Sequence, residues 1–261
     1  MKSKINYLVT ILSILLLLSA CEFDNFNEPA TEFTGRLKFG EENLNTKQGT
    51  LFRLFQYEED GYIAAKDRPI SINIDQEGNF SALLFPGRYK LTVNENGGVF
   101  NVYDWIDFPK SENDGLDTVY FTLDGKKTLD FEVIPYYKIN NLQAFFRNDS
   151  IISTFTIQKL TDRTETAIVG FRRISMYLSP TMHVNNDTQM EVFRSTATVD
   201  TPIEMQAHLR DYYNNTHYIN NYRNYVYVRI GVSLRISAQD FIFSKIIKVE
   251  GIPQETINKF K

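Results

Sequence analysis

The sequence is poor in the residues from which metal sites, disulfides and many catalytic sites are built. Its 261 residues include one Cys, and its three His, His183, His208 and His217, show no metal-ligand spacing. A single Cys excludes a disulfide within the chain. No Gly-x-Ser-x-Gly motif, phosphate-cradling Gly-rich loop or dinucleotide fingerprint occurs either. We therefore predict no metal, no cofactor and no catalytic residue, and a protein that is not an enzyme.

Basic segments and long apolar runs are also missing. The formal net charge is −4 and no run of Lys and Arg occurs, which argues against nucleic acid as a partner because phosphate binding depends on such side chains. The longest apolar run, Tyr7–Leu18, is much shorter than the roughly 20 residues that a membrane-spanning helix requires. The sequence thus predicts neither nucleic-acid binding nor a retained transmembrane anchor.

That apolar run instead has the features of a secretory signal peptide. Lys2 and Lys4 precede it, and it ends in the small residues Ser19 and Ala20 before Cys21. Leu18-Ser19-Ala20-Cys21 resembles the lipobox of bacterial lipoproteins. The resemblance implies a cleaved signal peptide over residues 1–20 and acyl chains, palmitate among them, on Cys21, which would hold the protein firmly on a membrane. A buried structural cysteine is the alternative.

The expected location is the cell envelope, with the lipid in the outer membrane. Residues 21–30 are polar and without apolar periodicity, so we expect a tether there. Glu22 and Asp24 loosely resemble the surface-export signals of some Gram-negative lipoproteins, which implies exposure on the cell surface.

The rest of the chain predicts an all-β fold of two consecutive β-sandwich domains. Short alternations of apolar and polar residues are separated by clusters of Gly, Asn, Asp and Pro, which is typical of antiparallel sheets. Ile134-Pro135 marks the expected boundary, because Pro cannot continue a central strand. We expect one domain over residues 31–135, another over 136–252, and a tail over 253–261.

The expected strands follow these alternations. In the first domain they are Phe33–Phe39, Leu51–Tyr57, Ile70–Ile74, Phe80–Leu84, Tyr89–Val93, Val119–Leu123 and Leu129–Ile134. In the second they are Ile151–Ile157, Ile174–Leu178, Ile203–Leu209, Val226–Ile236 and Phe241–Val249.

Two turns stand out in the first domain. Asp75–Asn79 predicts a hairpin with Gly78 at a positive φ, and a calcium loop is its alternative. Phe85–Tyr89 predicts the next hairpin. With the Gly35-led first strand, these steps resemble the carboxypeptidase-regulatory or transthyretin-like module.

The strand over Val226–Ile236 is the clearest in the chain. Its apolar residues alternate with Tyr225, Tyr227, Arg229, Gly231, Ser233 and Arg235. We expect the first set in the core and the second set on a face that meets water or a partner. Strands of this kind suggest an immunoglobulin- or fibronectin type III-like second domain.

Taken in order, several segments resemble the two-domain lipoproteins of domain-of-unknown-function family 3823. They are the lipobox, the tether, Thr34-Gly35-Arg36-Leu37, Asn96-Gly97-Gly98-Val99-Phe100, and Asp130-Phe131-Glu132-Val133-Ile134-Pro135-Tyr136. Members of this family tend to accompany starch-utilisation-type (Sus-like) glycan importers of the outer membrane. The resemblance implies where the protein acts, beside such an importer, and does not imply a chemical reaction.

Aromatic segments between strands are the candidate ligand sites. The segment 101–116 carries Tyr103, Trp105 and Asp107, and a flat ring beside polar groups suits the apolar face of a sugar. Rings that merely cover the end of the first sandwich are the alternative. The second segment, Asp211–Tyr225, is rich in Tyr and Asn like many binding loops, and its candidates are Tyr213, Tyr218 and Tyr222. A long turn with one or two buried tyrosines is the alternative there.

These observations favour a non-catalytic lipoprotein that binds polysaccharide or oligosaccharide beside an importer complex. The second hypothesis is a structural or adhesion lipoprotein with a protein partner, because two sandwiches after a tether make a spacer with exposed strand edges. The third hypothesis, a hydrolase, ranks last. Glycosidases need two carboxylates at a defined separation, and the sequence does not show such a separation.

Overall fold

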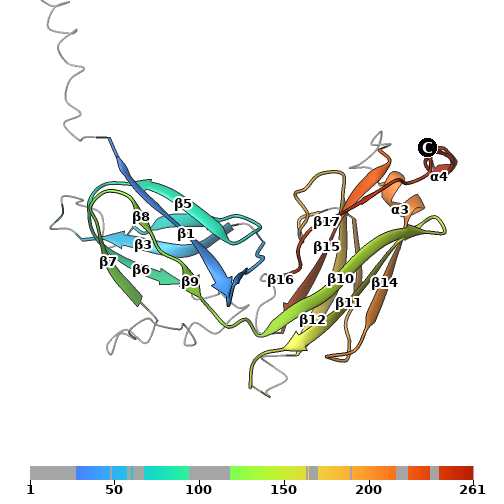
Figure 1. Ribbon diagram of the computed structural model, residues 1–261, viewed down its shortest axis with the longest axis horizontal. Coiled ribbons are helices and arrows are strands. Elements are labelled where there is room, and N and C mark those ends of the chain that lie inside the picture. The colour runs from blue at the N-terminus through green and yellow to red at the C-terminus, as the bar shows by residue number, and fades with distance from the viewer. Residues whose placement is uncertain are drawn as a thin grey trace, which may run out of the picture.

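A computed structural model describes residues 28–47, 49–57, 60, 68–93, 118–162, 164, 170–188, 190–215, 223–235 and 241–260. Residues 1–20, over which a signal peptide was expected, and Cys21 therefore lie outside the described residues. The described chain is mostly β and forms two domains, which follow one another along the chain and are joined near Pro135 (Figure 1).

The first domain is one sheet that curls into a half-barrel (Figure 1). Within the described residues its strand order is β2-β1-β5-β4-β3-β6-β7, with β8 and β9 paired in parallel along β1. The strands are β1 (Thr31–Phe39), β2 (Glu42–Asn43), β3 (Gly49–Gln56), β4 (Ile70–Ile74), β5 (Asn79–Leu84), β6 (Gly87–Val93), β7 (Thr118–Leu123), β8 (Lys127–Thr128) and β9 (Phe131–Glu132).

Phenylalanine rings fill the concave side of this sheet. Phe52 lies 5.5 Å from Phe80 and 4.9 Å from Phe131 between ring centroids, and Phe33 lies 5.2 Å from Phe80. All four side chains are buried. Large rings from distant strands thus supply the core that a chain without a disulfide needs.

The two turns have different outcomes. Asp75–Asn79 joins the antiparallel strands β4 and β5, and the Asp75 carboxylate accepts from the backbone N–H groups of Glu77 and Asn79 at 2.9 and 2.8 Å. The predicted hairpin, with Gly78 at φ +82°, is confirmed. The hairpin expected at Phe85–Tyr89 is wrong. This step carries the chain from β5 to β6, which have no ladder together, because β6 pairs with β3 and β7.

The described residues of the second domain form two sheets. The smaller has the order β10-β11-β14, and the larger has the order β13-β12-β15-β16 with β17 also paired to β15. The elements are β10 (Tyr137–Arg147), β11 (Ser150–Lys159), β12 (Phe171–Ser179), β13 (Met190–Arg194), β14 (Ile203–His208), α3 (Leu209–Tyr213), β15 (Tyr225–Leu234), β16 (Phe241–Phe243), β17 (Ile247–Glu250) and α4 (Gln254–Phe260). Buried apolar side chains of β11, β12, β14 and β15 join in one core.

Several elements of this domain differ from the expectation, among them strand β13 and helix α3, for which no element was predicted. Strand β10 was not predicted, because Asn140 and Asn141 interrupt its apolar alternation and the ladder shifts register there. The single strand expected over Phe241–Val249 is divided into β16 and β17. The tail expected over residues 253–261 contains helix α4, which buries Ile257 and Phe260.

The polar face of β15 is also different from the expectation. Arg229, Gly231 and Ser233 are buried although they alternate with the core residues of the strand. Gln76, at the tip of the β4–β5 hairpin, hydrogen-bonds Arg229 from the first domain. Arg229 therefore meets the neighbouring domain, whereas Gly231 lies against Tyr177, Phe241 and Phe243 of its own domain.

Candidate functional site

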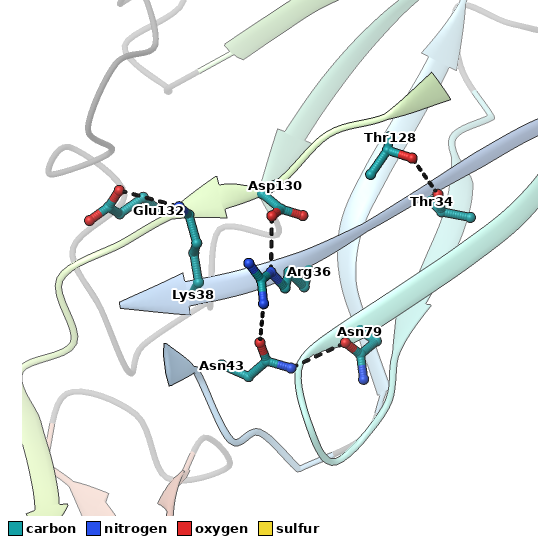
Figure 2. Close-up of polar contacts among 8 residues, drawn as sticks. All are labelled: Thr34, Arg36, Lys38, Asn43, Asn79, Thr128, Asp130 and Glu132. Carbon is teal, nitrogen blue, oxygen red and sulfur yellow. Dashed lines mark hydrogen bonds and ion pairs between the residues drawn. The ribbon is translucent and has the colours of Figure 1, made fainter. Parts of the chain in front are cut away.

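A row of polar pairs lies on the outer side of β1 (Figure 2). Phe33 and Leu37 of this strand point into the core, so the alternate residues point outward. Their partners come from β8, β9 and the residues between them, because these strands run parallel to β1. We call the set the β1 polar ladder: Thr34 with Thr128 at 3.0 Å, Arg36 with Asp130 at 2.9 Å, and Lys38 with Glu132 at 3.8 Å.

Gly35 makes this crossing possible. A Cβ at that position would lie 2.0 Å from the carbonyl oxygen of Leu129 and 2.5 Å from Cζ of Phe80. Only a residue without a side chain lets the chain between β8 and β9 pass so close to β1.

Asn43 extends the ladder toward the second domain. Its Oδ1 accepts from Arg36 at 3.3 Å, and its Nδ2 donates to Oδ1 of Asn79 at 3.2 Å (Figure 2). Asn79 is itself held by Asp75 at 3.0 Å. The orientation of the Asn43 amide is thus fixed from both sides.

Asn43 also lines a cleft of about 460 Å³ between the two domains. One wall is formed by the end of β1, strand β2 and the residues after it, and the other by the first half of β10 and the segment from β16 into β17. We call this the interdomain cleft. Its volume lies in the range of roughly 300–1,000 Å³ typical of small-molecule sites.

Charged, amide and aromatic groups meet in this cleft. Lys138 pairs with Glu42 across the two walls at 3.1 Å, and its ammonium lies 5.8 Å from the centre of the Phe39 ring. Burial raises the pKa of the Tyr137 phenol above its ordinary value. The amide-bearing side chains of the lining are Asn43, Asn45, Asn140 and Asn141.

The β10 bulge shapes the second wall. The register shifts between Asn140 and Gln143, and Asn141 adopts a left-handed φ of +56°, a conformation that Asn tolerates better than most residues. Bulges redirect side chains and are common beside binding sites. Asn140 donates from Nδ2 to Oε1 of Gln158 at 3.0 Å, which fixes its amide as well.

The arrangement suits a ligand rich in hydroxyl groups. Amides both donate and accept hydrogen bonds, a Lys–Glu pair offers one group of each kind, and a ring offers an apolar surface. Among the described residues no group of three or more His, Cys, Asp or Glu side chains could hold a metal ion.

The residues that the sequence offered for ligand binding do not line this cleft where they can be placed. Tyr213 is described, in α3; it is only 2 % exposed and its hydroxyl donates to the carbonyl oxygen of Arg223 at 3.0 Å. Its ring is therefore a core group and offers no face to a ligand, because the helix turns it inward. Tyr103, Trp105, Asp107, Tyr218 and Tyr222 lie outside the described residues.

Sequence reasoning missed the interdomain cleft. Its lining comes from three segments that are far apart in the chain, and neither wall carries a motif. The one local signal was the Asn140-Asn141 pair inside an apolar alternation, which is typical of a bulge.

Among the helices of the described residues, none has the length and the apolar composition that crossing a membrane requires.

The fold and the interdomain cleft, whose lining is part polar and part apolar, together define a two-domain, mostly β protein with a cleft at its domain joint. Two family models cover these domains. The model for the N-terminal domain of DUF3823, described as a protein of unknown function, matches residues 31–134. The model DUF3823_C, described as a domain of unknown function, matches residues 137–248. The chain belongs to the DUF3823 family, as the resemblance of its sequence predicted. Neither model describes an enzyme.

Solved structures share the fold. A DUF3823 family protein from Parabacteroides merdae is 24 % identical with a TM-score of 0.65, and one from Bacteroides ovatus is 23 % identical with a TM-score of 0.63; each match covers 86 % of this chain and 100 % of the other. A Bacteroides uniformis protein, described as a candidate carbohydrate binding protein, is 14 % identical with a TM-score of 0.62, covering 85 % and 100 %. No curated protein matches the chain.

Proposed function

We propose that this protein is a non-catalytic outer-membrane lipoprotein that binds polysaccharide or oligosaccharide in its interdomain cleft, as an accessory component of a Sus-like uptake system. The observation that carries the proposal is the cleft itself, about 460 Å³ in volume and lined by amide, charged and aromatic side chains together with aliphatic ones. The description of the Bacteroides uniformis relative as a candidate carbohydrate binding protein supports it.

The proposal includes a finer description of the fold and of the chain's ends. The first domain, over residues 31–135, is then a transthyretin- or carboxypeptidase-regulatory-like module, and the second, over 136–252, an immunoglobulin- or fibronectin type III-like one. The two packed sheets of the second domain support the latter. Cys21 carries the lipid, and residues 22–30 hold the domains away from the membrane.

Calorimetry of the full chain in detergent against a panel of plant and host polysaccharides tests the binding. Asn140→Ala should weaken binding about tenfold, because a hydrogen bond of about 1.4 kcal/mol is lost. Asn258→Ala, an exposed Asn on α4, is the matched control and should bind as the parent does. Absence of binding to every polysaccharide would refute the proposal.

Trp105→Ala in the same assay separates the cleft from the aromatic segments. Binding that survives Asn140→Ala and disappears with Trp105→Ala would place the ligand on the segment 101–116 and not in the cleft. Loss with Asn140→Ala and retention with Trp105→Ala is the expected result.

Metabolic labelling with a palmitate analogue tests the anchor. We expect label on the parent protein and none on Cys21→Ser, which should also move from the outer-membrane fraction to the soluble fraction. Co-purification of importer subunits with the labelled protein is expected for an accessory component. Stable capture of another envelope protein, without any glycan binding, would favour the scaffold hypothesis.

A further inference from the structure

Arg229 is the largest side chain that is fully buried in the described chain, and its donors cross the domain boundary. Its Nη2 donates to the carbonyl oxygen of Gln76 at 2.8 Å, and its Nη1 donates to Oε1 of Gln76 at 3.1 Å. The other donors remain within the second domain, with Nη1 to Val184 O at 3.2 Å and Nε to Ser244 O at 2.9 Å. Carbonyl and amide oxygens, and no carboxylate, accept these hydrogen bonds.

Gln76 completes the contact from the first domain. Its Nε2 donates to the carbonyl oxygen of Met182 at 3.2 Å, and its Oε1 accepts from the backbone N–H of Val184 at 3.1 Å as well as from Arg229.

 All of the hydrogen bonds that the Gln76 side chain makes within the described residues therefore reach across the domain boundary.

The same two residues connect both walls of the interdomain cleft. The Gln76 carbonyl oxygen, which accepts from Arg229, also accepts from the backbone N–H of Thr46 at 3.2 Å, directly after the lining residues Leu44 and Asn45. On the other wall, the Arg229 guanidinium binds Ser244 O and lies 4.3 Å from the centre of the Phe243 ring. Phe243 and Ser244 both line the cleft.

We propose that Gln76 and Arg229 form an interdomain clamp that fixes the two domains in one arrangement and thereby sets the shape of the cleft. The two are positioning residues, because neither of them lines the cleft and both act through residues that do. The fixed domain arrangement is independent of any ligand, whereas the effect on glycan binding rests on the proposed function.

Gln76→Ala is the sharpest perturbation. It removes the cross-domain hydrogen bonds of the side chain, while the β4–β5 turn keeps its own hydrogen bonds from Asp75. Gln254→Ala, an exposed Gln at the start of α4, is the matched control.

Double electron–electron resonance measures the distance between the domains without a ligand. The full chain with Cys21→Ser carries spin labels at Asp124→Cys in the first domain and Ser195→Cys in the second, both exposed positions. We expect one narrow distance distribution for the parent and for Gln254→Ala. Gln76→Ala should broaden it about twofold, because further domain arrangements become populated.

Calorimetry with a panel polysaccharide that binds the parent supplies the second readout. If Gln76→Ala leaves about a tenth of the molecules in the binding arrangement, the apparent affinity falls about tenfold. An unchanged, narrow distribution in Gln76→Ala would overturn the clamp. A broadened distribution in a protein that binds no polysaccharide would uphold the clamp and refute only the proposed function.

Discussion

Replacing Arg229 by Met tests how much stability the clamp contributes. Met matches the arginine side chain only as far as Nε and has no donor, so four acceptors lose the guanidinium. Two of them keep a second donor: Gln76 O keeps Thr46 N–H, and Gln76 Oε1 keeps Val184 N–H. The carbonyl oxygens of Val184 and Ser244 lose the donor that Arg229 provides.

The expected magnitude follows from these acceptors. A buried acceptor that loses its partner costs about 1–3 kcal/mol, which gives about 2–6 kcal/mol for two. Relief from burying a charge acts in the opposite direction; that burial also lowers the pKa of Arg229 to about 9, although the charge of Glu77 opposes the shift. We expect a net loss of about 2–4 kcal/mol in the free energy of unfolding.

Urea denaturation of the full chain with Cys21→Ser, followed by tyrosine and tryptophan fluorescence, measures this loss. Arg235→Met is the control, because Arg235 directly follows the same strand but is exposed. It should change the free energy of unfolding by less than about 0.5 kcal/mol. An Arg229→Met protein as stable as this control would show that the desolvation cost of the charge cancels its hydrogen bonds, and would refute the reasoning.

Two further substitutions test the fold. Gly35→Ala should lower the free energy of unfolding by about 3 kcal/mol, because the new Cβ overlaps the carbonyl oxygen of Leu129. Gly40→Ala is the comparison: with φ +60° and no atom within 4 Å of its Cβ, it should lower that free energy by about 1 kcal/mol. Calorimetric melting measures both variants. Asp149→Asn should lower the melting temperature at neutral pH. A hydrogen bond from Lys259 lowers the pKa of Asp149 below 3.8, so its contribution is complete above that pH and disappears as the pH falls through the lowered pKa. The melting temperatures of the parent and of Asp149→Asn should therefore converge in strong acid. A difference that does not change with pH would contradict the role of the ionised Asp149 carboxylate.

Strand positions were predictable where one face is apolar and the other is wet. Strand β4 has the predicted bounds, Ile70–Ile74, because Ile72 and Ile74 face the core and their neighbours face water. The alternation fails in β10, where the ladder with β11 shifts register at the bulge that contains Asn140 and Asn141. A bulge is a property of two strands, so one strand's sequence does not reveal it.

The candidate site was less predictable than the strands. Composition favoured aromatic segments between strands, but a cleft between domains is built by segments that share no local pattern. Tyr213 shows the difficulty, since its neighbours have the composition of a binding loop and yet the short helix α3 turns the ring into the core. Which face of a turn is buried depends on what packs beneath it.

Arg229 shows why the polar face of a strand does not identify its surroundings. Alternation correctly separates Arg229 from the apolar residues of β15, but it does not distinguish water from a second domain as the environment of that face. A cation needs hydrogen-bond acceptors when it is buried, and the hairpin tip at Gln76 supplies two of them. A non-catalytic binder gains affinity when its site is already in the binding arrangement, because the free energy of ordering is then not subtracted from that of binding. A buried arginine between two domains is thus the kind of residue that a preformed cleft at their joint requires.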